Sequence, residues 1–323
     1  MQIRTNSGHS SNVSAARELI IDEHHAGQRI DNFLISCLKG LPRTRIYRIL
    51  RRGEVRVNKG RIRQHYRLKS GDVVRIPPVR LHASPPERPP PSSLQTLVGE
   101  RILFEDRGLI VLDKPSGVAV HGGSGLSHGI IEVLRAARGP DQYLELVHRL
   151  DRDTSGCLMI AKRRPVLTAL HAAFRRHKVK KRYLVLVKGQ WNGASREVNS
   201  SLLRSVLRSG ERLVGVDAAG KAGRTRFIPL SVGSTASLLQ AVPFTGRTHQ
   251  IRVHAASLGH PVAGDGKYGE RDFNQRMREH GLRRLFLHAA DLRFENPGDE
   301  TVLSIEAPLP AELLGPLEQL GLG

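Results

Sequence analysis

A group of ionisable side chains at residues 148–156, HRLDRDTSG, has residue types that could do chemistry. It lies between apolar segments, so it is expected to form a polar turn between two buried strands, where reactive groups are often mounted. Asp151 could act there as a nucleophile. A glycosidase pair of Asp151 and Asp153 is disfavoured, because side chains two residues apart on a turn rarely bracket a sugar. A structural Asp/Ser turn that closes a hairpin explains the segment equally well.

A second polar segment, TGRTHQIRVH, combines a helix start with two arginines. Thr248 can cap a helix whose fifth residue is Arg252, and Gly259 would end it. Gly246 and Arg247 lie just upstream, where free backbone N–H groups favour an anion. A capped surface helix with solvated Arg and His side chains is the alternative, and the segment alone does not decide between the two.

Three further motifs do not support a function. GVDAAGKA (215–222) has the spacing of a phosphate-binding loop, but Ala222 stands where Mg²⁺ binding needs Ser or Thr, so a surface turn is preferred. HGGSG (121–125) fails the nucleophile-elbow pattern because Leu126 follows it, and it is interpreted as a glycine-rich turn. His249 and His254 are five residues apart and would diverge on a helix, so we expect no metal site.

The polar segments must be positioned by a domain rich in short apolar strands. Strands are expected at residues 102–105, 109–115, 158–162, 183–189, 238–242, 285–289 and 302–308. Helices are expected at residues 129–138 and 165–176. Because the strands outnumber the helices and do not follow a strict β-α-β order, the sequence predicts an α+β fold with a mixed, mainly antiparallel sheet.

A proline-rich stretch divides the chain. Residues 78–95 are rich in proline and serine, a composition that favours polyproline II, and we interpret them as a semi-rigid linker. A small domain at 17–77 and a large domain at 96–323 are therefore expected. The Ser-, Asn- and Gly-containing residues 1–16 are expected to be a flexible tail.

The small domain is strongly basic. Residues 17–80 contain 16 Lys and Arg but only 6 Asp and Glu. The segment 43–53 is expected to be helical, with Pro42 in the first turn and Gly53 after the end. One face of this helix carries three arginines, Arg45, Arg48 and Arg52. A lone run of charge is more often a solvated surface, but the overall charge favours an interaction with a phosphate backbone.

The composition of the whole chain indicates a polyanionic partner. Its 323 residues include 51 Lys and Arg and 30 Asp and Glu, a net charge of +21, which makes nucleic acid the default partner. No apolar run approaches the ~18 residues of a membrane span, and no aromatic amphipathic helix indicates a membrane surface. Cys37 and Cys157 form no CxxC pair, and no secretory signal is evident, so we expect a cytoplasmic protein.

Taken together, the motifs resemble two known families. RIDNFL (29–34), LPRTRIYRILRRGEVRVNKGR (41–61) and RLKSGDVVRIP (67–77) resemble the S4 RNA-binding domain, which implies an α/β module that grips structured RNA. HRLDRDTSG, KKRYLVLVKG (180–189), GRTHQIRVH and GHPVAGDGKYG resemble the RluA family of RNA pseudouridine synthases over essentially the whole large domain.

The RluA resemblance implies an enzyme that isomerises uridine to pseudouridine in 23S ribosomal RNA, at more than one position. The N1–C1′ bond breaks and the base is rejoined through C5, with no redox step, so no cofactor is expected. The expected partner is 23S RNA or its large-subunit precursor, and a monomer would suffice. A non-catalytic ribosome-assembly protein is the alternative, but it leaves the polar segments of the large domain unexplained. A hydrolase that uses Asp151 and Asp153 would instead release the free base.

The same resemblance assigns roles to individual residues. Asp151 is the expected nucleophile, whether at C1′, at the base or through a glycal, and Arg252 is expected to keep it charged through an ion pair. Tyr183 is expected to stack on uracil, and its phenol could relay or accept the C5 proton. Arg149 is expected to fill the space that the flipped uridine leaves, and Asp153 is expected to be only a turn residue. Further RNA contacts are expected from His148, Thr154, Gly246, Arg247, His249, Arg45, Arg48 and Arg52.

Overall fold

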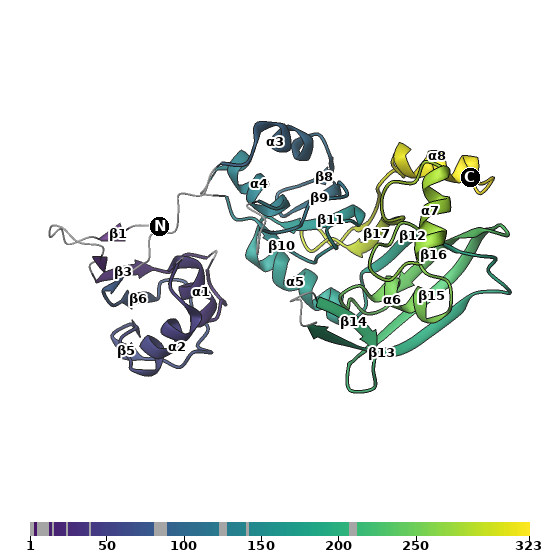
Figure 1. The fold of residues 1–323 in the computed structure, drawn as a ribbon. Helices are drawn as coiled ribbons and strands as arrows, with labels where there is room; N and C mark the ends of the chain where they lie inside the picture. The colour runs from purple at the N-terminus through teal and green to yellow at the C-terminus, as the bar shows by residue number, and fades with distance from the viewer. Residues whose placement is uncertain are drawn as a thin grey trace. The chain divides into compact units, whose positions relative to one another are not determined.

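The computed structural model describes residues 3–4, 13–14, 16–23, 25–38, 40–80, 89–122, 128–139, 142–206 and 212–323. The chain divides into two compact units, Met1–Pro89 and Pro90–Gly323 (Figure 1). Much of the expected tail and linker, and part of the expected glycine-rich turn, lie outside the described residues.

The first unit combines two helices with a five-stranded antiparallel sheet, in the strand order β1-β3-β6-β4-β5. Its sheet consists of β1 (Ile3–Arg4), β3 (Arg17–Ile20), β4 (Arg56–Val57), β5 (Gly60–Arg61) and β6 (Val73–Ile76), while β2 (Val13–Ser14) pairs with β7 (Val79–Arg80). The helices are α1 (Ile30–Cys37) and α2 (Arg43–Arg51). Both helices and the sheet contribute side chains to one hydrophobic core.

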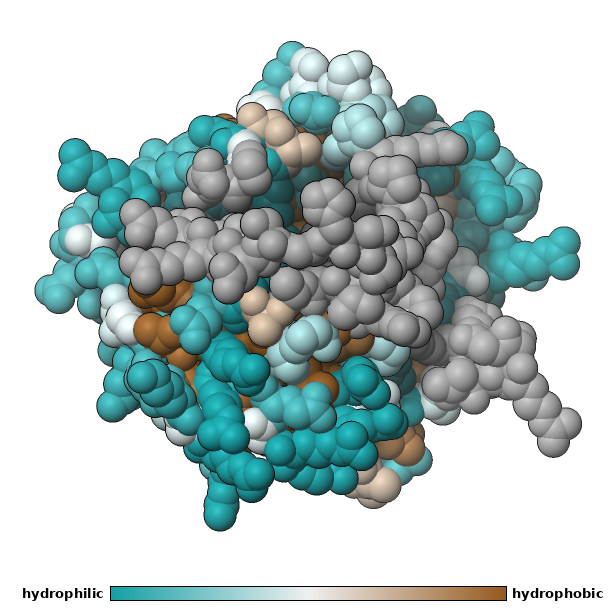
Figure 2. All heavy atoms as spheres, turned by 90° about the vertical axis from the view of Figure 1, so that its left-hand side faces the viewer, coloured by the Kyte–Doolittle hydropathy of each residue, from teal (hydrophilic) through white to brown (hydrophobic). Residues whose placement is uncertain are grey.

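Helix α2 separates apolar from basic side chains, as the sequence predicts. Ile46 and Leu50 are buried on one side. The three arginines of the other face, Arg45, Arg48 and Arg52, are exposed. Gly53 follows the helix with a φ of 69°, as predicted. Pro42 was expected in the first turn, but it is the N-cap residue. Hydrophilic residues cover most of the described surface that faces the viewer in Figure 2.

The second unit is built on one large sheet in the strand order β14-β13-β15-β16-β12-β17-β11-β9-β8, with β10 beside β11 and β18 beside β17. The strands that precede α6 are β8 (Ile102–Glu105), β9 (Leu109–Lys114), β10 (Glu145–Leu146), β11 (Ser155–Ala161), β12 (Lys180–Lys188), β13 (Arg196–Val206), β14 (Arg212–Val216), β15 (Lys221–Val232) and β16 (Ala236–Pro243). The strands that follow are β17 (Leu287–Glu295) and β18 (Val302–Glu306). The helices are α3 (Ser92–Gly99), α4 (Ile130–Arg138), α5 (Arg164–Arg175), α6 (Gln250–Ser257), α7 (Arg271–Glu279) and α8 (Ala311–Gln319).

Helices cover both faces of this sheet. Apolar side chains of α4 and α6 pack on one face, and those of α5, α7 and α8 pack on the other. Successive residues of β9 contribute to opposite sides, as the pleat of a doubly covered strand requires. None of the described helices has the length and apolar composition that crossing a bilayer requires.

The predicted α+β class with a mixed, mainly antiparallel sheet is confirmed. Among the strand pairs of the described residues, only β11 and β17 run parallel, with Ser155 opposite His288 and Gly156 opposite Ala289. Strand β17 lies between β11 and β12, although it begins about a hundred residues after the end of β12. The turn before β11 and the middle of β12 are thereby brought to the same part of the sheet.

The structure also contains elements that the sequence did not predict. The hairpin strands β13, β14 and β15 and the helices α7 and α8 lie in segments for which no structure was expected. Regular structure enters the expected linker at both ends, because β7 begins at Val79 and α3 begins at Ser92. The short strands β1 and β2 lie within the expected tail.

Candidate active site

Asp151 lies in the turn between β10 and β11, and the neighbouring segment 114–117 holds this turn. The buried Lys114 donates hydrogen bonds from Nζ to the backbone oxygens of Pro115, Val118 and Arg152, at 2.7, 2.8 and 2.9 Å. The N–H of Gly117 donates to the same Arg152 oxygen. Burial lowers the pKa of Lys114 to about 7. The turn is therefore fixed through its backbone, and the Asp151 side chain is left free to face the pocket.

The close approach of β11 and β17 just after the turn depends on Gly156. Its φ is 105°, and a Cβ at this position would lie 2.3 Å from the carbonyl oxygen of Ala289. Only glycine satisfies both the left-handed backbone and the short contact. The last residue of HRLDRDTSG thus fixes where the Asp151 turn joins the sheet.

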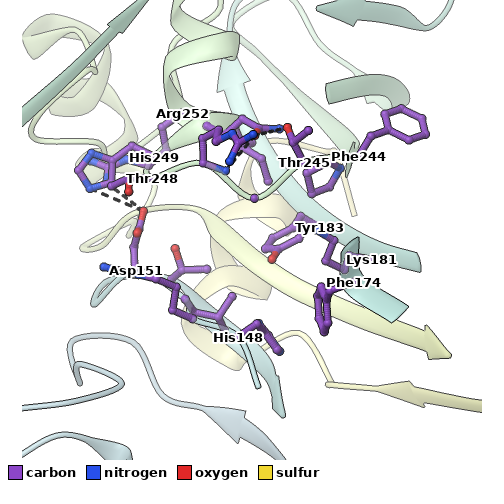
Figure 3. A pocket seen from close by; sticks show the side chains of 18 of the residues that line it. His148, Asp151, Phe174, Lys181, Tyr183, Phe244, Thr245, Thr248, His249 and Arg252 are labelled. Carbon is purple, nitrogen blue, oxygen red and sulfur yellow. Dashed lines mark hydrogen bonds and ion pairs between the residues drawn. The ribbon is translucent and has the colours of Figure 1, made fainter. Parts of the chain in front are cut away.

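Arg252 on α6 reaches two carboxylates. Its Nε and Nη2 each donate a 2.7 Å hydrogen bond to Asp265, and its Nη1 lies 3.6 Å from Oδ2 of Asp151 (Figure 3). The expected pair of Asp151 and Arg252 is therefore present, but the sequence did not predict the closer partner. Burial by itself would raise the pKa of Asp265, but the Arg252 guanidinium and two backbone N–H groups hold it below the ordinary value.

The start of α6 differs from the prediction. Thr248 does not cap the helix; His249 is the N-cap residue, in a left-handed conformation with a φ of 54°. The side chain of Gln250 organises the preceding loop, because its Oε1 accepts hydrogen bonds from the Thr245 hydroxyl and the Arg247 backbone N–H. One of the donors expected to bind an anion is therefore already used. The helix ends as predicted, with Gly259 at a φ of 80°.

A pocket of about 590 Å³ opens beside these groups. Figure 3 shows it extending from Asp151 and His249, past Tyr183, to Lys181 and Phe174. All of the expected contact residues of the second unit line it, namely His148, Arg149, Thr154, Gly246, Arg247 and His249. The expected residues Arg45, Arg48 and Arg52 belong to the other unit. The pocket is large enough to admit a base with its ribose.

Tyr183 forms the middle of the pocket wall. It is buried and lies opposite Ala241 of β16 and Ala289 of β17, both of which have small side chains. Burial, together with the negative charge of Asp151, raises the pKa of the phenol above its ordinary value. The phenol is therefore protonated at neutral pH and is a hydrogen-bond donor, not a ready proton acceptor.

His148 supports the pocket wall through its ring. The ring packs against Phe174 with 5.3 Å between the centroids, and Nε2 accepts a 3.1 Å hydrogen bond from the Met159 backbone N–H. Burial lowers the pKa of His148 to about 3, so the imidazole is neutral. Thr154 is buried, whereas His148 is half-buried and Arg149 is exposed.

Asp153 and Asp217 lie in turns and do not line the pocket. Asp153 pairs with Arg152, with 3.0 Å between Oδ1 and Nε, and borders a separate cavity. In the GVDAAGKA segment, Asp217 accepts a hydrogen bond from the Ala219 N–H in the connection between β14 and β15, which confirms the expected surface turn.

No three His, Cys, Asp or Glu side chains in the described part of the chain form a group that could hold a metal ion.

The sequence interpretation missed three side chains that shape the pocket. Asp265 and Tyr268 lie in GHPVAGDGKYG, a segment that contributed to the family resemblance without a role for either residue. Lys181 lies two residues before Tyr183, and its Nζ lies 5.7 Å from the centroid of the Phe174 ring. Burial lowers the pKa of Lys181 to about 8. The sequence signal for Lys181 was its position in KKRY, close to Tyr183.

Comparison with protein families identifies the class of enzyme to which this fold and pocket belong. Residues 108–257 match the RNA pseudouridylate synthase family, and residues 28–74 match the S4 domain family. The solved structure of human RNA pseudouridylate synthase domain containing 4 has the same fold, with a TM-score of 0.59 at 24% identity over 71% of this chain and 96% of that one.

Curated relatives extend the similarity to nearly the whole chain. Ribosomal large subunit pseudouridine synthase C of Haemophilus influenzae is 52% identical over 309 residues, which cover 95% of this chain and 96% of that protein. The protein of the same name from Escherichia coli (strain K12) is 52% identical over 303 residues, which cover 93% and 95%. The chain belongs to the RNA pseudouridylate synthase family, and it is an isomerase with an S4 domain.

Proposed function

We propose that this enzyme isomerises uridine to pseudouridine in 23S ribosomal RNA, at more than one position, with Asp151 as the nucleophile. The assignment of Asp151 rests on the position of its carboxylate. It lies 3.6 Å from the Arg252 guanidinium, in a pocket that Tyr183 also lines. The substrate is supported by the names of the relatives that are 52% identical to this chain. A cytoplasmic location follows from this substrate.

In the proposed reaction the target uridine leaves its stack and enters the pocket, at a cost of roughly a few kcal/mol. Asp151 forms a bond to the uridine as the nucleophile, the N1–C1′ bond breaks, and the uracil turns. A C5–C1′ bond then forms, and the bond to Asp151 breaks so that the carboxylate is regenerated. C5 then loses its proton and N1 carries one, so the overall change is an isomerisation. The exposed Arg149 at the pocket is proposed to occupy the place of the flipped base.

Each pocket group has a proposed part in these steps. Arg252 keeps Asp151 ionised and orients it, because a guanidinium beside a carboxylate favours the charged form. Tyr183 stacks on the base and keeps water from it while it is detached. Lys181, which carries positive charge at the other end of the pocket, attracts the RNA.

The S4 domain, proposed to span residues 17–77, supplies a second contact with RNA. Its exposed arginines on α2 suit a phosphate backbone, and such contacts carry much of the affinity of nucleic-acid complexes. The residues between the domains, 78–95, are proposed to be the linker to a catalytic domain at 96–323. A monomer is proposed to suffice, because no step of the proposed reaction requires a residue from a second copy of the chain.

The test compares the wild type with Asp151→Asn on 23S RNA, with pseudouridine detected by chemical labelling and reverse-transcription stops. Asp151→Asn should abolish the signal while RNA affinity is retained. Asp153→Asn is the matched control, because it changes a carboxylate in the same turn that does not line the pocket, and it should remain active. Equal modification by the wild type and Asp151→Asn would reject the assignment.

The same samples test the hydrolase alternative. An isomerase retains the base, whereas a hydrolase that uses the two aspartates would release free uracil. Chromatography of the reaction should therefore find no free uracil in amounts comparable with the uridine consumed.

A further inference from the structure

Two groups approach the same oxygen of Asp151. Nη1 of Arg252 lies 3.6 Å from Oδ2, and Nε2 of His249 lies 3.8 Å from the same atom (Figure 3). Both groups come from the start of α6, one helical turn apart in sequence. Within the described part of the chain, Oδ1, the other carboxylate oxygen, forms no ion pair. The carboxylate is therefore approached from one side only.

The hydrogen bonds behind His249 suit a proton on Nε2. The hydroxyl oxygen of Tyr268 accepts a 3.0 Å hydrogen bond from the Val214 backbone N–H. The hydroxyl hydrogen is then free to point at Nδ1 of His249, which lies 2.7 Å away. In this arrangement Nδ1 is the acceptor, and in the neutral ring Nε2 carries the hydrogen that faces Asp151.

The backbone of His249 has an energetically unfavourable conformation. Its φ of 54° and ψ of 20° are left-handed, a region that non-glycine residues occupy at a cost and that clusters at functional sites. The His249 ring meets Tyr268 edge-on, with 5.4 Å between the centroids, and the Arg252 guanidinium lies 5.0 Å from the centroid of the same Tyr268 ring. Tyr268 therefore supports both groups that approach Asp151.

We propose that His249 is a positioning residue that, together with Arg252, fixes Oδ2 of Asp151 and leaves Oδ1 as the attacking oxygen. The proposal rests on the proposed function, in which Asp151 is the nucleophile. It replaces the expected role of His249 as an RNA contact. Separations of 3.6 and 3.8 Å are too long for hydrogen bonds. Catalytic contacts are often long in the free enzyme and shorten when substrate excludes water.

The electrostatic surroundings agree with a neutral, donating imidazole. Burial lowers the pKa of His249, and among its charged neighbours Asp151 and Asp265 oppose this effect while Arg252 and Lys267 reinforce it. A neutral ring donates to the carboxylate without competing with Arg252 for the role of counter-charge.

Two substitutions of His249 distinguish the effect of side-chain length on the rate from the effect of the backbone conformation. His249→Asn suits the left-handed backbone, because asparagine is enriched there, but its amide does not extend to Asp151. His249→Gln places an amide N–H close to the position of Nε2. We expect the single-turnover rate at saturating RNA to fall on the order of 10- to 100-fold in His249→Asn, and His249→Gln to recover roughly tenfold of that loss. The RNA dissociation constant should change less than about threefold in both, because a positioning residue acts on the rate and not on ground-state binding.

Three outcomes would overturn the proposal. A wild-type rate in His249→Asn would show that Asp151 needs no second contact. Equal rate losses in both variants would indicate a structural role, and weaker RNA binding at an unchanged rate would restore His249 as an RNA contact. Asp151→Asn is assayed alongside: if it stays active, the proposed function fails, whereas an inactive Asp151→Asn beside a fully active His249→Asn rejects this inference alone.

Tyr268→Phe supplies an independent measurement. Without the hydroxyl, the proton of His249 can move to Nδ1, which would turn the Nε2 lone pair toward the carboxylate. The rate should fall about as far as in His249→Asn, and the double variant should be little slower than either single one, because coupled residues are not additive. Fully additive losses would contradict a shared role.

Discussion

Arg252 is bound more closely by Asp265 than by Asp151. Both Asp265 oxygens accept 2.7 Å hydrogen bonds from the guanidinium, whereas Oδ2 of Asp151 lies 3.6 Å from Nη1. A buried, doubly hydrogen-bonded carboxylate fixes the plane of the guanidinium. Asp265 therefore determines which N–H group Arg252 presents to Asp151, and the chemistry of the pocket depends on a residue outside it.

Arg252→Lys should lower activity strongly, although it preserves the positive charge. An ammonium cannot bind Asp265 with two parallel hydrogen bonds and also point a third donor at Asp151. We expect the single-turnover rate to fall on the order of 100-fold, with RNA binding little changed. The exposed Arg276 on α7 provides the control Arg276→Lys, which should behave like the wild type. Full activity of Arg252→Lys would show that charge alone suffices.

Asp265→Asn should remove a pH-dependent part of the stability. Because the pKa of Asp265 is lowered in the folded protein, its ionisation stabilises the fold above the ordinary pKa of about 4, and this contribution disappears as the pH falls through the folded-state pKa. We expect a loss of roughly 3 kcal/mol near neutral pH and a smaller loss near pH 3. Urea unfolding can be followed by the fluorescence of Trp191, the single tryptophan, which lies in the second unit. A pH-independent difference would contradict the prediction.

Gly156→Ala should destabilise the second unit by about 3 kcal/mol or more, because the new methyl group would meet the Ala289 carbonyl oxygen. Gly193→Ala is the matched control: Gly193 also has a positive φ, of 85°, but no atom lies within 4 Å of its Cβ position. The control should lose only about 1 kcal/mol, the cost of a left-handed alanine. Equal losses in the urea midpoints would mean that the close approach to β17 is not the cause.

Replacing the arginines of α2 should change the salt dependence of RNA binding. The variant carries Arg45→Gln, Arg48→Gln and Arg52→Gln. If each arginine neutralises one phosphate, the slope of log K against log salt should become shallower by about 2 to 3. The single-turnover rate at saturating RNA should be retained, because the pocket is lined only by the second unit. An unchanged slope would remove α2 from the RNA interface.

The fold was largely predictable where local patterns are strong. The apolar runs that became β9, β11, β12 and β16 are buried on both faces, so their composition alone marks them as strands. The hairpin of β13 to β15 was missed because exposed and polar residues interrupt its apolar positions. Helix α7 was missed because it buries only Phe273 and Met277. Pairing of β17 with β11 could not be inferred, since nothing local specifies a partner so distant in sequence.

The site was predictable only in part, and mainly through the family resemblance. Asp151, Tyr183 and Arg252 do line one pocket, as that resemblance implied. The supporting residue Asp265 was not predicted, because a buried aspartate in a GDG loop resembles an ordinary turn residue. The N-cap was assigned to Thr248 from its side-chain preference, but the hydrogen bonds of Gln250 and the left-handed His249 set the actual start of the helix.

The place of β17 also determines when the pocket can form during synthesis of the chain. Asp151 precedes β11 and Tyr183 lies on β12, but these strands are joined only through β17, which the ribosome delivers more than a hundred residues after Tyr183. Contacts between such distant segments close late in folding. We therefore expect nascent chains that end before Leu287 to lack an assembled pocket, so that catalysis begins only once the second unit is nearly complete.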